Sequence, residues 1–97
     1  MARAIVGVLT LHLHLPEVYS LKEKRSTIQP LLKRAHQQFN ASTAEVGAQD
    51  EWQSAEIAFA IVSNSSQHTN QVLQSIMTWV EDSYPNVEIL QEEFETL

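Results

Sequence analysis

Cysteine is absent from the 97-residue sequence. This absence excludes disulfide bonds, iron–sulfur clusters, thiolate zinc sites and cysteine nucleophiles, and it is compatible with a reducing cytoplasm. Long apolar runs are also absent, because the N-terminal segment "MARAIVGVLTLHLHLPE" is interrupted by arginine and histidine. That segment is too short and too alternating for a signal peptide or a membrane span. We therefore expect a single soluble cytoplasmic domain over residues 1–97, without membrane contact.

Positive charge is scarce and confined to the first third of the chain. Residues 1–34 carry six basic and two acidic side chains, whereas residues 35–97 carry ten acidic and no basic ones, which together give the net charge of −6. A net acidic protein does not favour nonspecific nucleic-acid binding, but a local basic patch can still attract phosphate because salt screening limits the reach of charge to about 10 Å. The segment "SLKEKRSTIQPLLKRA" (20–35) holds most of this positive charge.

Alternation of apolar and other residues predicts the first strand. Over residues 3–15 every second side chain points the same way, which is the period of a strand, and Pro16 ends the pattern. Shorter strands are expected at 42–46, 56–63 and 87–90, and the tail after residue 90 can extend the last of them. The loop between the strands at 42–46 and 56–63 makes an irregular hairpin.

Apolar residues at helical spacing predict two helices. The first begins at Ser20, where Glu23 completes a capping box, and Asn40 is its expected end. Pro30 lies inside this helix and predicts a kink rather than a break. The second helix follows the serine-rich segment at 63–66 and ends at "YPN" (84–86). The order βαββαβ predicts the ferredoxin-like α+β fold, with two helices on one face of a four-stranded antiparallel sheet.

Four segments in this order resemble a known family. "SLKEKR" after a long first strand, "AEV" (44–46), "QDEWQSA" (49–55) and "VSN" (62–64) are similar to the YlxP-like proteins, which are small bacterial ferredoxin-like proteins of unknown function. The resemblance covers nearly the whole chain and implies no established enzymatic activity. Genes of this family often lie beside genes for translation initiation and ribosome maturation, which implies a role near RNA or ribosomal components.

The basic helix is the first candidate for a functional surface. On a helical wheel, Lys22 and Lys33 lie on the solvent face with Arg25 at its edge, and Lys24 flanks the apolar stripe with its ammonium expected to reach water. A stripe of this kind can contact phosphates, although an ordinary solvated helix face would have the same composition. The candidate nucleic-acid-binding residues are Lys22, Lys24, Arg25, Lys33 and Arg34.

The face of the sheet that the helices leave open is the second candidate surface. Its central residues are expected to be Val6, Val8, Ala58, Ala60 and Val62. They lack the aromatic side chains with which an RNA-recognition motif stacks bases. An uncovered apolar face commonly marks an interface, so we expect self-association, most simply as a two-fold dimer. The alternative is that Phe94 and Leu97 fold back over this face within one chain.

Two further clusters carry side chains that can take part in chemistry. His12 and His14 share one face of a strand, but no third metal ligand is indicated, so they are interpreted as polar residues and no metal or other cofactor is expected. Asp50, Glu51 and Trp52 could support acid–base chemistry. The favoured interpretation is structural, with Trp52 covering one end of the core while Asp50 and Gln49 bond to the loop backbone.

Two hypotheses for function remain from the sequence. The first is a noncatalytic protein that contacts RNA or ribosomal components through its basic first helix. The second is an oligomeric interaction scaffold that uses the open face of the sheet. An enzyme is not expected, because no nucleophile–base pair or metal constellation is visible.

Overall fold

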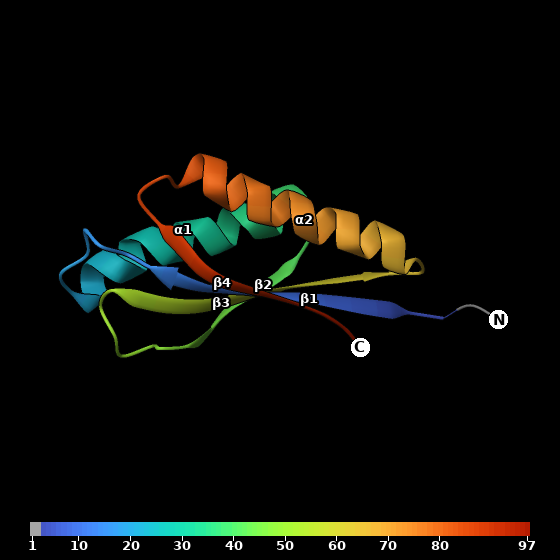
Figure 1. The fold of residues 1–97 in the computed structure, drawn as a ribbon, viewed down its shortest axis with the longest axis horizontal. Coiled ribbons are helices and arrows are strands. Elements are labelled where there is room, and N and C mark those ends of the chain that lie inside the picture. The colour runs from blue at the N-terminus through green and yellow to red at the C-terminus, as the bar shows by residue number, and fades with distance from the viewer. Residues whose placement is uncertain (1–2) are drawn as a thin grey trace.

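The computed structural model describes residues 3–97, which form one sheet and two helices (Figure 1). The elements are β1 (Ile5–His14), α1 (Leu21–Phe39), β2 (Ser42–Gly47), β3 (Ser54–Ser63), α2 (Ser66–Ser83) and β4 (Glu88–Thr96). The strands lie in the order β2-β3-β1-β4, and every neighbouring pair is antiparallel. Both helices cover the same face of the sheet. The ferredoxin-like α+β fold predicted from the sequence is therefore confirmed.

The strands differ from the predicted ones mainly at their ends. β3 begins at Ser54, two residues before the predicted start, because the antiparallel ladder with β1 continues to the pair formed by Ser54 and His14. β2 continues one residue further than expected, to Gly47. The predicted extension of the last strand into the tail is confirmed, since β4 continues to Thr96.

Helix α1 is capped at both ends as the sequence indicated. The Ser20 hydroxyl accepts a hydrogen bond from the Glu23 amide at 3.1 Å, and the Glu23 carboxylate accepts one from the amide of Tyr19 at 2.7 Å. Asn40 ends the helix in the left-handed conformation, with φ of 53°. The helix continues through Pro30 as one unbroken element.

The core lies between the helices and one face of the sheet. Alternate strand residues point into it, and the helices contribute one apolar stripe each. Its fully enclosed members include Leu9, Leu11, Leu13, Ile57 and Phe59 from the sheet, Ile28, Leu31 and Ala35 from α1, and Leu73, Ile76 and Val80 from α2. Gly7 lets α2 approach β1 closely, because a Cβ atom there would collide with the side chain of buried Thr69.

Candidate nucleic-acid interface

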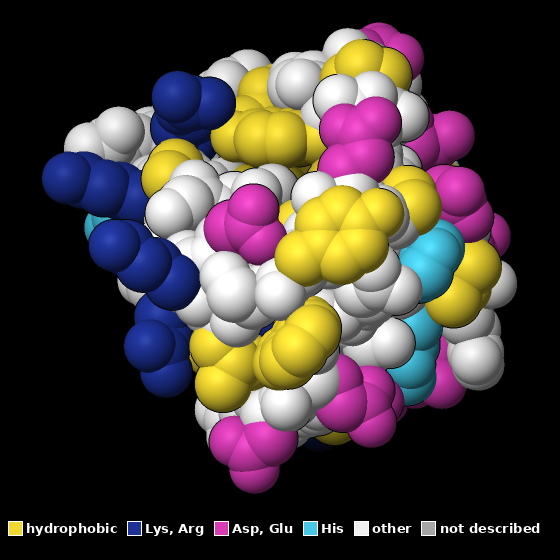
Figure 2. Space-filling view, turned by 90° about the vertical axis from the view of Figure 1, so that its left-hand side faces the viewer, with side chains coloured by type: hydrophobic (Ala, Val, Ile, Leu, Met, Phe, Trp, Pro, Cys, Tyr) yellow, Lys and Arg dark blue, Asp and Glu magenta, His cyan; other side chains and the backbone are white. Residues whose placement is uncertain are grey.

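The exposed cations of α1 lie on its surface away from the core. Lys22, Arg25, Lys33 and Arg34 are all exposed, and no carboxylate of residues 3–97 lies within 4.0 Å of their charged nitrogens. Figure 2 shows lysine and arginine side chains gathered along one side of the molecule. The predicted cationic surface is therefore present, although Lys24 does not contribute to it.

Three of these cations form a stripe along α1, which we call the cationic stripe: Lys22, Arg25 and Lys33. At a rise of 1.5 Å per residue, the stripe is roughly 16 Å long. Beside its second half, a shallow groove of about 730 Å³ separates α1 from β2 and is lined in part by Gln29, Lys33 and His36. Glu45 also lines this groove, so the groove beside the cationic stripe combines cationic, polar and acidic side chains.

Arg34 lies on another side of the helix, where it contacts α2. Its guanidinium donates a hydrogen bond of 2.9 Å to the Tyr84 hydroxyl. Tyr84 packs edge-on against Trp79, which packs edge-on against Phe39, with ring centroids 5.7 Å apart in both pairs. Arg34 is therefore partly engaged in holding the ends of the two helices together, whereas the stripe residues are free of such contacts among the described residues.

Lys24 is buried, so the expectation that its ammonium reaches water is wrong. Only 2% of Lys24 is exposed, and its Nζ donates to the carbonyls of Ala48 at 2.6 Å and Glu51 at 2.8 Å. The same ammonium lies 2.8 Å from Oε2 of Glu45, an ion pair in which Oε2 accepts no well-aligned hydrogen bond from the described residues. Lys24 thus connects α1, β2 and the loop between β2 and β3, and it cannot contact RNA without unfolding this region.

The position of Lys24 on the helical wheel was the signal that indicates burial. At 100° per residue, Lys24 lies about 20° from Leu31 and about 40° from Ile28, both of which are fully buried. It therefore lies within the apolar stripe rather than beside it. A lysine in that position must find acceptors inside the protein, and the partners on the later loop cannot be identified from periodicity.

Two loops meet at one end of the molecule, which we call the loop end: residues 15–20 and 48–53. Gln53 joins them, because its side-chain amide donates to the carbonyl of Val18 at 3.0 Å and its own carbonyl accepts from the amide of Leu15 at 2.8 Å. His14 Nδ1 also lies 3.1 Å from the Gln53 carbonyl. The loop end is thus fixed by hydrogen bonds between its two loops and by further ones from β1 and α1.

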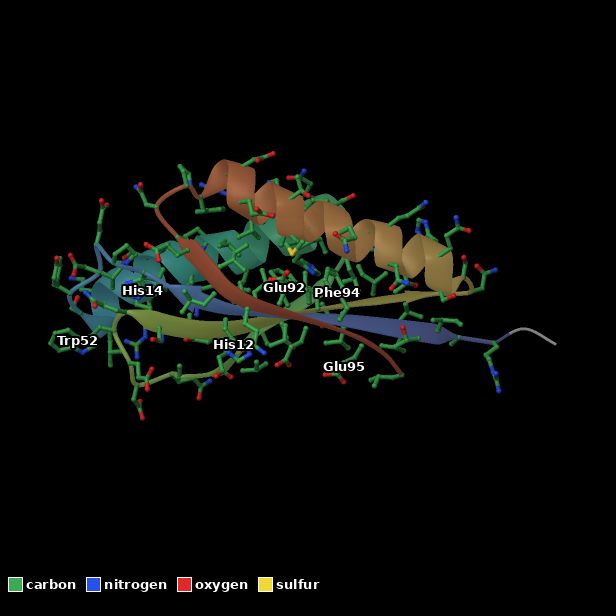
Figure 3. All side chains as sticks on the ribbon, in the orientation of Figure 1. His12, His14, Trp52, Glu92, Phe94 and Glu95 are labelled. Carbon is green, nitrogen blue, oxygen red and sulfur yellow. The ribbon has the colours of Figure 1, made fainter. Side chains whose placement is uncertain are left out.

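Trp52 lies on the surface of the loop end and does not cover the core. It is 53% exposed, and Figure 3 shows it at the extremity of the molecule. The structural interpretation of this segment holds for Gln49, whose side chain donates to the carbonyl of Glu45 at 3.4 Å. The expectation that Trp52 covers one end of the core is wrong, because Lys24 and Gln53 hold the loop in a conformation that turns the indole outward.

The open face of the sheet has the predicted apolar centre. The register places Val6 beside Val62, Val8 beside Ala60, and Thr10 beside Ala58. The described tail does not cover this face, because β4 pairs with the edge of β1 and Leu97 continues that pairing by donating its amide to the carbonyl of Val6. Phe94 pairs with Leu9 and lies on the helix side of the sheet, opposite to Glu95 (Figure 3). The alternative in which Phe94 and Leu97 fold over the open face is therefore wrong.

The polar half of the open face is acidic. His12 lies between two carboxylates, 3.4 Å from Glu56 on β3 and 3.8 Å from Glu93 on β4. Among residues 3–97, no group of three or more histidine, aspartate or glutamate side chains could hold a metal ion. A separate cleft of about 440 Å³ between α1 and the loop after α2 is lined by Glu17 and Glu23 without any lysine or arginine. This cleft repels phosphate and does not extend the cationic stripe.

Comparisons with known proteins place the chain in a family. Residues 6–94 match the model of a protein family of unknown function, DUF503. The chain is 41% identical over 69 residues to the uncharacterized protein YlxP of Bacillus subtilis (strain 168), which covers 71% of this chain and 74% of that protein. The fold is similar to that of the de novo designed protein Foldit4, with a TM-score of 0.62, 11% identity and coverage of 98% of this chain and 97% of that one. Neither described helix is long and apolar enough to cross a membrane. The chain therefore belongs to the DUF503 family, and the resemblance to YlxP-like proteins noted in the sequence is confirmed.

Proposed function

We propose that this protein is a noncatalytic RNA-binding module, located in the cytoplasm, that contacts RNA or a ribosomal component through the cationic stripe of α1. The observation that supports this proposal is the exposure of Lys22, Arg25 and Lys33 in one row, with no carboxylate of residues 3–97 within 4.0 Å of any of them. Because most of the remaining charge is negative, phosphates are repelled elsewhere and RNA meets the protein in one orientation.

Salt dependence of binding tests this proposal. Three phosphate contacts to a single strand predict that log K falls with log salt at a slope of about −2. We would measure binding to a fluorescent oligouridylate of twelve nucleotides by anisotropy at several salt concentrations. Replacing Lys22, Arg25 and Lys33 together by glutamine should abolish most of the slope without lowering the melting temperature, because all three side chains are exposed.

Arg34→Gln provides the matched control. It removes a cation from the same helix, but Arg34 lies off the stripe and bonds to Tyr84. Its slope should stay near that of the unmodified protein. An equal slope in the triple variant and the unmodified protein would remove the cationic stripe from the mechanism.

The open face of the sheet favours a second function, self-association into a homodimer. Val62 and Leu97 are 68% and 75% exposed, and the register places both beside Val6, so they form an apolar row across three strands. A two-fold axis parallel to the strands places this row against the same row of a second molecule. The same axis places the acidic β4 over β2 of the other copy, whose open-face residues Ser42 and Ala44 are uncharged.

Val8→Lys tests the dimer by sedimentation. Val8 lies in the middle of the open face beside Glu95, so the new ammonium has a carboxylate neighbour and the monomer should stay folded. We expect the unmodified protein to sediment as a dimer and the variant as a monomer. Gln74→Lys, at an exposed residue of α2 on the other side of the sheet, is the control that should leave the dimer intact. A monomeric unmodified protein at high concentration would exclude this function.

A further inference from the structure

The loop end presents two large aromatic side chains to solvent. Tyr19 is 66% exposed and Trp52 is 53% exposed. They come from different loops. Tyr19 follows Val18 and Trp52 precedes Gln53, and the side chain of Gln53 is hydrogen-bonded to the carbonyl of Val18. The two aromatic residues are therefore held at the same end of the molecule. Figure 2, which looks onto this end, shows exposed hydrophobic side chains there beside the lysines and arginines.

The loop that carries Trp52 is held in place by buried hydrogen bonds. The buried ammonium of Lys24 fixes the carbonyls of Ala48 and Glu51, on either side of the turn that precedes Trp52. Ala48 adopts a left-handed conformation with φ of 55°, which an alanine takes only when its surroundings impose it. The backbone of this loop is thus pre-organised, so it loses little entropy when a partner binds.

The charge of the loop end is negative. Residues 15–20 and 48–53 include Glu17, Asp50 and Glu51, all exposed, and include no lysine or arginine. Carboxylates beside an aromatic face attract a cation, because the ring quadrupole and the carboxylates act in the same direction. The same carboxylates repel phosphate at the loop end itself, whereas the lysines and arginines lie beside it (Figure 2).

We propose that the loop end is a docking site for an arginine-bearing basic segment of a protein partner. A guanidinium stacks on the indole of Trp52 while Asp50 or Glu51 accepts its hydrogen bonds, since arginine combines stacking with planar donation to carboxylates. Tyr19 enlarges the apolar contact, and aromatic residues of this kind often dominate binding energy. This site is independent of RNA binding, because it uses none of the residues of the cationic stripe.

Titration with a defined peptide tests the site. The probe is a twelve-residue peptide in which arginine and glycine alternate, and a peptide of alternating glutamate and glycine is the negative probe. Binding is followed by NMR through the indole N–H signals of the two tryptophans, with the Trp52 signal identified by its loss in Trp52→Ala. The arginine peptide should shift the Trp52 signal and leave the Trp79 signal in place.

Two variants and a matched control complete the experiment. Trp52→Ala, which removes an exposed side chain and should leave the fold intact, is expected to raise the Kd at least about tenfold, within the range for a desolvated cation–π contact. Asp50→Asn/Glu51→Gln should weaken the salt dependence of peptide binding. Glu92→Gln/Glu95→Gln removes the same charge from β4 and should change the Kd less than about twofold.

Three results would overturn the proposal. They are an unchanged Kd for Trp52→Ala, an equal loss of affinity in the β4 control, and a larger shift of the Trp52 signal by an oligouridylate than by the arginine peptide. The last result would assign the loop end to RNA. Peptide binding that is unchanged in the triple variant of the cationic stripe would support the loop end as the docking site. The proposal of RNA binding is tested separately, by the salt dependence described above.

Discussion

Replacing Lys24 with methionine should destabilise the protein far more than any other substitution of a cation in this chain. Methionine has a similar length and fills the same space, but it donates none of the three contacts that the ammonium makes to Ala48, Glu51 and Glu45. Removing one partner of a buried ion pair typically costs 3–5 kcal/mol. Because the Glu45 side chain keeps 17% of its exposure, water can solvate part of the carboxylate that is left behind. We therefore expect a loss of about 3 kcal/mol in the free energy of unfolding.

Urea unfolding followed by circular dichroism measures this loss. In thermal unfolding, a domain of this size gains or loses roughly 4–8 °C in melting temperature per kcal/mol, so the melting temperature should fall by about 12–24 °C. Amide hydrogen exchange should also become faster in residues 48–53, because the loop loses its connection to α1. Arg25→Met, at the neighbouring exposed position, is the control and should cost less than about 0.5 kcal/mol.

A double variant separates the orphaned charge from lost packing. If much of the cost comes from the unpaired carboxylate, Lys24→Met/Glu45→Leu should be more stable than Lys24→Met by about 1 kcal/mol or more. A cost below about 1 kcal/mol for Lys24→Met would refute the reasoning, since it would mean that the ammonium gains little from its buried partners.

Two further substitutions test the backbone and packing described above. Gly7→Ala should cost about 2 kcal/mol, in the range for overpacked cores. Thr69→Ser in the same chain should recover a large part of this cost in thermal unfolding, because it removes the methyl group that the new Cβ meets and keeps the hydroxyl that bonds to Ser65; equal costs in the single and double variants would contradict this contact. Ala48→Gly should raise the melting temperature by several degrees, because glycine adopts positive φ without the strain of about 1 kcal/mol that alanine carries; a lower melting temperature would show that Ala48 is not strained.

Local patterns in the sequence were sufficient for most of the fold. The alternation around Leu9 and Leu11, the capping box of Ser20 and Glu23, and the stop at Asn40 each depend on residues close in the chain. Their physical causes act over a few residues, so they can be predicted from the sequence alone. The strand boundaries were less accurate, because pairing across the sheet decides where β3 begins.

The candidate sites depend on contacts between distant segments, and there the sequence was less informative. Lys24 finds its carbonyl partners 24 and 27 residues away, and Gln53 finds Val18 across 35 residues. No periodicity indicates such pairs. The exposure of Trp52 follows from them, so the expectation that Trp52 covers one end of the core was wrong. The exposed cations were predicted because a helical wheel alone places Lys22 and Lys33 opposite the apolar stripe.

The distribution of charge across the sheet also bears on how this protein avoids aggregation. β4 is an edge strand of nine residues whose outer backbone groups could pair with the same strand of another molecule. Glu88, Glu92, Glu93 and Glu95 lie along this edge with no lysine or arginine among them. Two copies of β4 brought together would set carboxylates against carboxylates over the whole length of the new ladder. This acidic edge therefore acts as a barrier to edge-to-edge pairing between two β4 strands, and it leaves the faces and the ends of the molecule as surfaces less opposed to association.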